Sequence, residues 1–254
     1  MPRAARNPEA TQFGFAHVGD AGEKTQRVGH VFQRVAPRYD VMNDVMSGGW
    51  HRVWKNIFVD VVAPRAGENV LDVAGGTGDI AKRLLKKTGG AINLTLADLS
   101  PEMLSVGKRR MADAGYWNKV TWVQADAAAL PFDDACFDVI TIAFGLRNVT
   151  RIDDALAEFY RCLRTGGRFF CMEFSPQVAA PLAKPYALYR DHIIPRLGAV
   201  VAHDRAAYQY LAESIQKFPA PHALGARLQA AGFAHTRADP LMGGVVYIHR
   251  AWKG

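Results

Sequence analysis

Cysteine is scarce in this chain of 254 residues, which has three. Cys136, Cys162 and Cys171 are odd in number, widely spaced and set in apolar sequence. This arrangement indicates no disulfide framework and no spacing typical of a metal site, so we expect no metal. Few cysteines without a pairing pattern are typical of a reducing compartment, which favours the cytoplasm.

Long apolar runs are also missing. No run reaches the roughly 20 residues that a membrane-spanning helix needs, and the N-terminus has no apolar core typical of a secretory signal. The formal net charge is +7, but the basic residues are scattered. The chain has no zinc-finger spacing, no arginine-rich run and no signature of an RNA-binding sheet, so nucleic acid is not an expected partner. An anionic membrane surface is compatible with this charge.

The overall composition, with 49% apolar and 22% charged residues, is typical of a soluble globular protein. The length fits one substantial α/β domain with additions. We expect residues 1–22 to form a disordered basic arm and residues 23–66 to form a helical cover with a break at 47–50. The main domain then covers residues 67–254, with a helical insertion at 176–221.

Strands and helices alternate through the main domain. Five apolar strands are expected at residues 69–73, 92–98, 120–126, 137–145 and 167–175. Helices follow the first, second and fourth strands, and the second helix has Ser100 as a candidate N-cap with Pro101 at its first position. Two strands near 233–238 and 243–252 follow one another directly and predict a hairpin at the sheet edge. The pattern predicts a mixed, mostly parallel seven-stranded α/β sheet with helices on both faces.

A glycine-rich stretch, VLDVAGGTGD at residues 70–79, ends the first of these strands. Gly76, Gly78 and Ala81 fit the loose pattern G-x-G-x-x-G/A, in which a strand leads through a tight turn into a helix. Asp98 follows about 20 residues later at the end of the second strand, where a carboxylate can bind both hydroxyls of a ribose. An NAD enzyme and an S-adenosylmethionine enzyme both fit these residues.

The residues after the third strand help to choose between an NAD enzyme and an S-adenosylmethionine enzyme. Asp126 stands at the end of this strand, followed by a run of small residues, and its side chain or the next amide can bind the edge of an adenine. The turn carries little positive charge, whereas a pyrophosphate favours a basic residue beside a helix N-terminus. A sulfonium ligand has no phosphate and tolerates the nearby carboxylates of Asp72 and Asp79. Acidic residues after three successive strands form a pattern that we associate with class I methyltransferases.

With these residues placed, the chain resembles the ubiquinone/menaquinone biosynthesis C-methyltransferase family, called the UbiE family, from about Val31 to Lys253. The matching stretches are RYDVMNDVMSGGWHRVWK (38–55), VLDVAGGTGD (70–79), ADLSPEML (97–104), DAAALPF (126–132), FGLRNV (144–149), EFS (173–175) and YQYLAESIQKFP (208–219). FGLRNV and RYDVMND separate this family from other methyltransferases. The resemblance implies the class I methyltransferase fold, which is Rossmann-like.

The resemblance also implies S-adenosyl-L-methionine as methyl donor and a polyprenylated quinol as acceptor. The acceptor would be demethylmenaquinol, 2-polyprenyl-6-methoxy-1,4-benzoquinol or both. The family's cofactor contacts fall on Thr77, Asp98, Asp126 and Ala127 of this chain, and we expect Gly75 and Gly78 of the same turn to bind the cofactor as well. One position departs from the family, because members often carry serine where this chain has Ala143. The contact made by that hydroxyl is therefore absent.

Methylation of a ring carbon needs an electron-rich carbon, which a neighbouring deprotonated hydroxyl provides. FGLRNV follows the fourth strand at the carboxyl edge of the sheet, where open α/β folds bind ligands. We expect Arg147 to stabilise the phenolate as a cation, because a free arginine with a pKa above about 12 is a poor base. Asn148 would orient the phenolate. The proton would leave through water, a nearby carboxylate or Tyr39, the third candidate catalytic residue.

An acceptor with a lipid tail requires contact with a membrane. Residues 181–203 mix apolar and basic side chains and have two interpretations, a helix on the bilayer surface or a lid helix packed on the domain. We expect a cytoplasmic protein peripherally associated with the inner membrane, with a homodimer or a quinone-biosynthesis complex left open. The alternatives are a methyltransferase of the same fold with another small aromatic or lipid acceptor, a non-catalytic scaffold and an NAD oxidoreductase.

Overall fold

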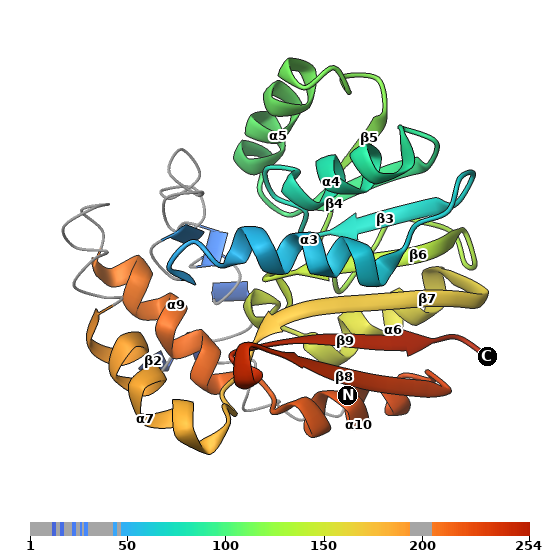
Figure 1. Ribbon diagram of the computed structural model, residues 1–254. Helices are drawn as coiled ribbons and strands as arrows, with labels where there is room; N and C mark the ends of the chain where they lie inside the picture. Colours follow the sequence, from blue (N-terminus) through green and yellow to red (C-terminus); the bar gives the residue numbers. More distant parts are fainter. Residues whose placement is uncertain are drawn as a thin grey trace.

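The computed structural model describes the chain at residues 12–13, 16–17, 22–23, 26, 28–29, 43–44, 47–193 and 205–254. At its centre is a seven-stranded sheet with helices on both faces (Figure 1). Five strands pair in parallel, and the last two add antiparallel pairs at one edge. The expected mixed, mostly parallel sheet with an edge hairpin is therefore confirmed.

The strands, in spatial order, are β5 (Val120–Gln124), β4 (Asn93–Asp98), β3 (Asn69–Val73), β6 (Phe137–Ala143), β7 (Leu163–Phe174), β9 (Val246–Trp252) and β8 (His235–Leu241). The described helices are α3 (His51–Val62), α4 (Asp79–Thr88), α5 (Pro101–Asp113), α6 (Ile152–Cys162), α7 (Ala180–Leu188), α9 (Arg205–Lys217) and α10 (Pro221–Ala230). Short helical turns are η3 (Leu146–Asn148), η4 (Tyr189–Ile193) and η5 (Met242–Gly244). A separate antiparallel pair joins β1 (Gln12–Phe13) to β2 (Ala16–His17).

Two apolar cores enclose the sheet, because neighbouring residues of a strand point to opposite faces. On β3, Val70 belongs to the core that α3, α4 and α5 cover, and Leu71 belongs to the core that α6 and α10 cover. Both side chains are fully buried. Strands buried on both faces are nearly continuous apolar runs, which is why the sequence predicts the central strands well.

The order of the strands determines where a ligand can bind. β3 lies at the centre, with β4 on one side and β6 on the other. Open α/β sheets bind ligands beyond the carboxyl ends of the strands, where the strand order reverses in this way. The loops after β3, β4, β5 and β6 therefore meet at one edge. In Figure 1, α7 and α9 lie beyond this edge.

The start of α5 follows the sequence prediction. Ser100 Oγ accepts a hydrogen bond from the Met103 N–H at 3.2 Å, and Pro101 is the first residue of the helix. The expected break at 47–50 is also present, because a turn at 48–50 precedes α3. The cap at Ser100 fixes the path of the chain directly after β4.

Two strands begin three or more residues away from the expected position. β7 begins at Leu163, because Leu163 already pairs with Phe137 of β6. β9 begins at Val246, because Gly243 and Gly244 have φ angles of 65° and 89° and form the turn of the edge hairpin.

The expected boundaries of the N-terminal arm, the helical cover and the main domain stay predictions. Within the part of the chain that the structure describes, no helix combines the length and the hydropathy needed to span a membrane.

Candidate functional site

A cavity of about 160 Å³ lies at the carboxyl ends of the central strands. The segments after β3, β4, β5 and β6 supply most of its lining, including Asp98, Asp126 and Asn148. Val28 and Gly29, from the N-terminal part of the chain, also line it. Among the described lining residues, two are aspartates and none is a lysine or an arginine. The cavity therefore presents hydrogen-bond acceptors in a mostly apolar wall.

Asp98 ends β4 and holds the glycine turn. Its Oδ2 accepts the Gly76 N–H at 2.8 Å, and its Oδ1 accepts the Ser100 N–H at 2.9 Å. Burial raises the pKa of Asp98, and the N–H groups of Ser100 and Gly76 oppose this by stabilising the carboxylate. A carboxylate oxygen accepts more than one hydrogen bond. Asp98 can therefore accept two more, as the neighbouring hydroxyls of a ribose require.

Asp126 and Ala127 follow β5 and line the cavity. Asp126 Oδ1 accepts the Ala128 N–H at 2.9 Å, which fixes the turn. The other oxygen, Oδ2, lies 3.8 Å from Arg151 Nη2 in a partly exposed ion pair. The edge of an adenine presents an amine donor and ring-nitrogen acceptors, which a carboxylate and a backbone N–H can match.

Gly75 lies beneath the turn that joins β3 to α4. A Cβ atom at this position would be 2.5 Å from Leu96 Cγ and 2.9 Å from Asp72 Oδ2. These distances leave no room for a side chain, so the turn can pass this close to the sheet only with glycine. Gly75 therefore shapes the site but is not among the residues that line the cavity.

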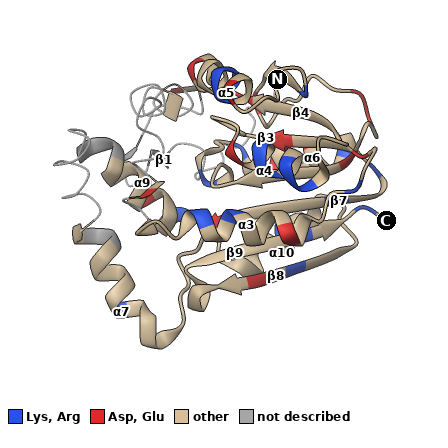
Figure 2. Cartoon of the chain, turned by 45° about the horizontal axis from the view of Figure 1, so that its top comes forward, with Lys and Arg blue, Asp and Glu red and all other residues tan. Residues whose placement is uncertain are grey.

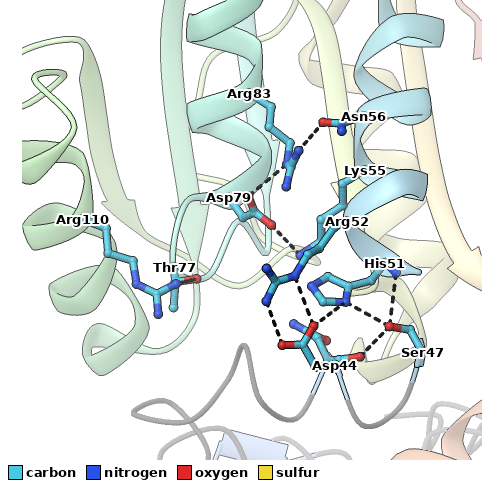
Figure 3. A network of polar contacts seen from close by, with 11 residues as sticks. Asp44, Ser47, His51, Arg52, Lys55, Asn56, Thr77, Asp79, Arg83 and Arg110 are labelled. Atoms are coloured by element: carbon cyan, nitrogen blue, oxygen red, sulfur yellow. Dashed lines mark hydrogen bonds and ion pairs between the residues drawn. The ribbon is translucent and has the colours of Figure 1, made fainter. Parts of the chain in front are cut away.

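Thr77 and Gly78 lie on the other side of the same turn. With residues of α3, α4 and α5, they line a second hollow of about 470 Å³. Thr77 Oγ1 accepts a hydrogen bond from Arg110 Nη1 at 3.1 Å (Figure 3). Of the six expected cofactor residues, the three at the end of β4 and after β5 line the cavity, and the three in the turn shape or flank it.

A network of ion pairs joins α3 to the first turn of α4 (Figure 3). Lys55 Nζ donates to Asp79 Oδ2 at 2.8 Å, and Arg83 Nε donates to Asp79 Oδ1 at 3.0 Å. Burial raises the pKa of Asp79, but Lys55 and Arg83 together hold it below its ordinary value. His51 beside them is neutral at pH 7, because burial first and Lys55 second lower its pKa to about 4. The network ties the start of α4, and with it the glycine turn, to α3.

Asn148, in the loop after β6, lines the cavity. Its Nδ2 donates to the Phe144 carbonyl oxygen at 3.4 Å. Its Oδ1 accepts a hydrogen bond from Tyr210 Oη of α9 at 3.2 Å. The amide is therefore held from two sides at the cavity surface.

Arg147 lies behind this loop in a buried ion pair. Its Nη1 donates to Glu173 Oε1 at 2.6 Å and to the Phe144 carbonyl oxygen at 2.7 Å. The guanidinium carbon lies 5.6 Å from the centre of the Phe174 ring, and the side chain is 2% exposed. Of the two residues expected to face the acceptor, the structure places Asn148 in the cavity lining and Arg147 outside it.

Tyr39 lies outside the described residues, so its role stays a prediction. Several cavity residues are missing from the expected site, among them Leu99, Met103 and Val149. Their sequence signal is only positional, because each follows a strand close to a residue that was expected. The partner of Arg147, Glu173, was visible as part of the EFS stretch but was assigned no role.

The lining fits S-adenosylmethionine better than a dinucleotide. A pyrophosphate would meet two carboxylates and no described lysine or arginine in this cavity. A sulfonium and an ammonium group are compatible with those carboxylates. The apolar side chains of Leu99, Met103 and Phe144 add contact area for a purine ring.

Comparison with known proteins agrees with this assessment. A sequence profile of the ubiE/COQ5 methyltransferase family matches residues 20–253. The chain is 51% identical over 245 residues to the ubiquinone/menaquinone biosynthesis C-methyltransferase UbiE of Zymomonas mobilis, covering 96% of this chain and 99% of that protein. It is 48% identical to the UbiE protein of Methylobacterium nodulans, covering 98% and 99% of the two chains.

Solved structures of lower identity share the fold. A SAM-dependent methyltransferase from Thermotoga maritima superposes with a TM-score of 0.65 at 17% identity, covering 89% of this chain and all of that one. Phosphoethanolamine N-methyltransferase 2 of Haemonchus contortus, solved with S-adenosyl-L-methionine, has a TM-score of 0.58 at 16% identity over 81% of this chain and 53% of that one. At these identities the likeness concerns the fold alone, and it confirms the predicted class I methyltransferase fold.

Proposed function

Because the chain belongs to the ubiE/COQ5 methyltransferase family, we propose that it methylates a ring carbon of a polyprenylated quinol in ubiquinone or menaquinone biosynthesis. The methyl donor is S-adenosyl-L-methionine. The acceptor is demethylmenaquinol, 2-polyprenyl-6-methoxy-1,4-benzoquinol or both. The observation that carries the proposal is the cavity at the carboxyl edge, whose described lining has two carboxylates and no lysine or arginine.

Three residues, at the end of β4 and after β5, would hold the cofactor. Asp98 accepts hydrogen bonds from the ribose hydroxyls, and Asp126 with Ala127 binds the adenine edge. Gly75, Thr77 and Gly78 act through the turn, which Asp98 already fixes by its bond to the Gly76 N–H. When bound, S-adenosylmethionine supplies an electrophilic methyl group on a positively charged sulfur.

The loop after β6 would act on the acceptor. Asn148 donates an N–H to the ring oxygen and favours its ionised form, which makes the neighbouring carbon nucleophilic. Arg147 supports this loop from behind, because its guanidinium holds both Glu173 and the Phe144 carbonyl. Because Glu173 balances the charge of Arg147, we propose that Arg147 acts by holding the loop and not as a cation facing the acceptor. Tyr39 stays a proposed route for the proton.

The proposed acceptor has a lipid tail, so the protein must reach its substrate at a membrane. We propose peripheral association with a membrane surface through α7 and the residues beside it. No residue of α7 is buried, and the helix contains one charged residue, Lys184. Leu182, Leu188 and Met242 are exposed on this part of the molecule. In Figure 2 the ribbon of α3, α4 and α5 is coloured at several lysine and arginine positions, whereas α7 is almost free of charge colours.

The assay of this proposal supplies the purified chain with S-adenosylmethionine carrying a labelled methyl group and with each demethylated quinol under reducing conditions. We expect label in the ring of at least one quinol. Asp98→Ala should weaken cofactor binding by about 10- to 100-fold, because it removes hydrogen bonds to a charged acceptor. Asp133→Ala, an exposed aspartate away from the cavity, is the matched control and should bind as the wild type does.

Calorimetry with S-adenosylmethionine and with NAD separates the alternatives. Binding of S-adenosylmethionine without label in either quinol would contradict the proposed acceptor and favour another acceptor or a scaffold. Binding of NAD in place of S-adenosylmethionine would overturn the proposal as a whole.

A further inference from the structure

A buried tyrosine from a distant part of the chain holds Asn148 at the cavity. Tyr210 lies on α9 and is 62 residues from Asn148 in sequence. Its side chain is buried, and its Oη lies 3.2 Å from Asn148 Oδ1. Tyr210 is not among the described residues that line the cavity, and its hydrogen bond to Asn148 connects it to a residue that does.

The direction of the Asn148 amide follows from its two neighbours. The Phe144 carbonyl oxygen can only accept a hydrogen bond, so the amide group 3.4 Å from it must be the NH2 group. The amide oxygen then faces Tyr210, whose hydroxyl must donate. Burial raises the pKa of Tyr210 above its ordinary value, so the hydroxyl keeps the proton that it donates.

This direction matters for an acceptor that ionises. A neutral ring hydroxyl can accept from an N–H or donate to a carbonyl oxygen, but a phenolate can only accept. An Asn148 amide turned the other way would place its oxygen against the developing negative charge. The NH2 group carries two hydrogens, of which the Phe144 carbonyl takes one, so the second is available at the cavity surface.

We propose that Tyr210 is a positioning residue for methyl transfer, because its hydroxyl holds the Asn148 amide with an N–H directed to the ring oxygen of the acceptor. This inference rests on the proposed function. The N–H that Tyr210 positions binds the ring oxygen more strongly once negative charge develops there, so loss of Tyr210 should affect kcat more than the binding of either substrate.

Tyr210→Phe tests this inference, because it keeps the ring and removes the hydroxyl. We expect kcat for quinol methylation to fall by about tenfold, with the KM for the quinol and the cofactor affinity within about twofold of wild type. Tyr208→Phe is the matched control. Tyr208 is a fully buried tyrosine on the same helix that is not among the residues lining the cavity, and its variant should keep the wild-type kcat.

A double-mutant cycle shows whether Tyr210 acts through Asn148. Asn148→Ala alone should lower kcat by about 100-fold. Adding Tyr210→Phe to Asn148→Ala should lower it no further, since the amide that Tyr210 holds is gone. Independent, multiplying losses would overturn the inference, as would a Tyr210→Phe variant with wild-type kcat. If the wild-type chain methylates neither quinol, the proposed function fails and this inference fails with it.

Discussion

Asp72, near the glycine turn, is a buried carboxyl group whose pKa is far from its ordinary value. Its carboxyl group is buried at the end of β3. Its Oδ1 accepts the Thr141 hydroxyl at 2.8 Å, and its Oδ2 has no hydrogen-bond partner among the described residues. Burial raises the pKa of Asp72 to about 7, although Thr141 and Lys55 lower it in part. The folded protein therefore favours the neutral acid.

Asp72→Asn should change how stability depends on pH. The folded-state pKa of Asp72 is above its unfolded value of 3.8, so its contribution to stability is present at low pH and is lost as pH rises toward about 7. Asparagine keeps the acceptor for Thr141 and does not ionise. The free energy of unfolding of the variant relative to wild type should therefore rise by about 1.3 kcal/mol from pH 5 to 6 and by about 1 kcal/mol from pH 6 to 7, where Asp72 begins to ionise in the folded state.

Urea denaturation of both proteins at pH 5, 6 and 7 measures this difference. A difference that stays constant with pH would show that Asp72 titrates at its ordinary value in the folded state.

Single residues of the site were predictable where they follow a strand directly. Asp98 and Asp126 end neighbouring apolar runs, and parallel strands bring such ends together. The burial of Arg147 was not predictable, because its partner Glu173 stands on a different strand and only the folded sheet joins them. The same holds for Tyr210, whose contact with Asn148 spans 62 residues.

At the scale of elements, α5 passes unusually close to the glycine turn. A Cβ atom on Gly107 would be 2.7 Å from the Trp122 ring of β5 and 3.2 Å from the carbonyl oxygen of Gly76. The helix therefore packs directly against the glycine turn and β5 at this position. This contact ties the shape of the cofactor cavity to the packing of α5.

Gly107→Ala should disturb both stability and cofactor binding. The added methyl group forces Trp122 or the turn to move, which should cost about 1–3 kcal/mol of unfolding free energy. It should also weaken S-adenosylmethionine binding, because the Gly76 backbone shifts. Denaturation midpoints and calorimetric titration measure the two effects.

Gly225→Ala in α10 is the control, since its Cβ would meet only Thr236 Oγ1, at 3.7 Å. It should stabilise the protein by about 0.5–1 kcal/mol, because alanine favours helix more than glycine does. Equal effects of the two substitutions would contradict the close contact at Gly107.

The central strands and the helices between them were predictable from apolar runs and caps. The first residues of β7 and β9 were not predictable in this way. Leu163 joins β7 because Phe137 pairs with it, and the glycines before β9 make a turn instead of extending the strand. Pairing across a sheet and positive φ angles are tertiary outcomes that local sequence patterns do not contain.

At the scale of the whole molecule, two of the most exposed apolar side chains lie in different regions. Leu188, on α7, is 57% exposed at the end of the molecule beyond the carboxyl edge of the sheet. Trp117 is 72% exposed in the turn before β5, which is at the opposite sheet edge from the hairpin. Substitutions at these two residues test which region of the protein contacts the membrane.

Leu188→Asp should weaken binding to vesicles of anionic phospholipid by about tenfold or more, because burying a leucine contributes about 1.5–3 kcal/mol. Trp117→Asp removes a larger exposed apolar side chain at the other edge and should leave binding unchanged. Sedimentation with vesicles measures both, and added salt should weaken wild-type binding through the net charge of +7. Equal loss in the two variants would place the membrane contact elsewhere.

The position of β3 between β4 and β6 has a consequence for synthesis on the ribosome. The walls of the cavity come from both sides of that central strand, and one lining residue, Asn148, is held by Tyr210 of α9. A nascent chain that stops short of α9 would lack this support, although its glycine turn would already be complete. Because a ligand stabilises only the state that binds it, the methyl donor would favour the finished enzyme over its incomplete precursors.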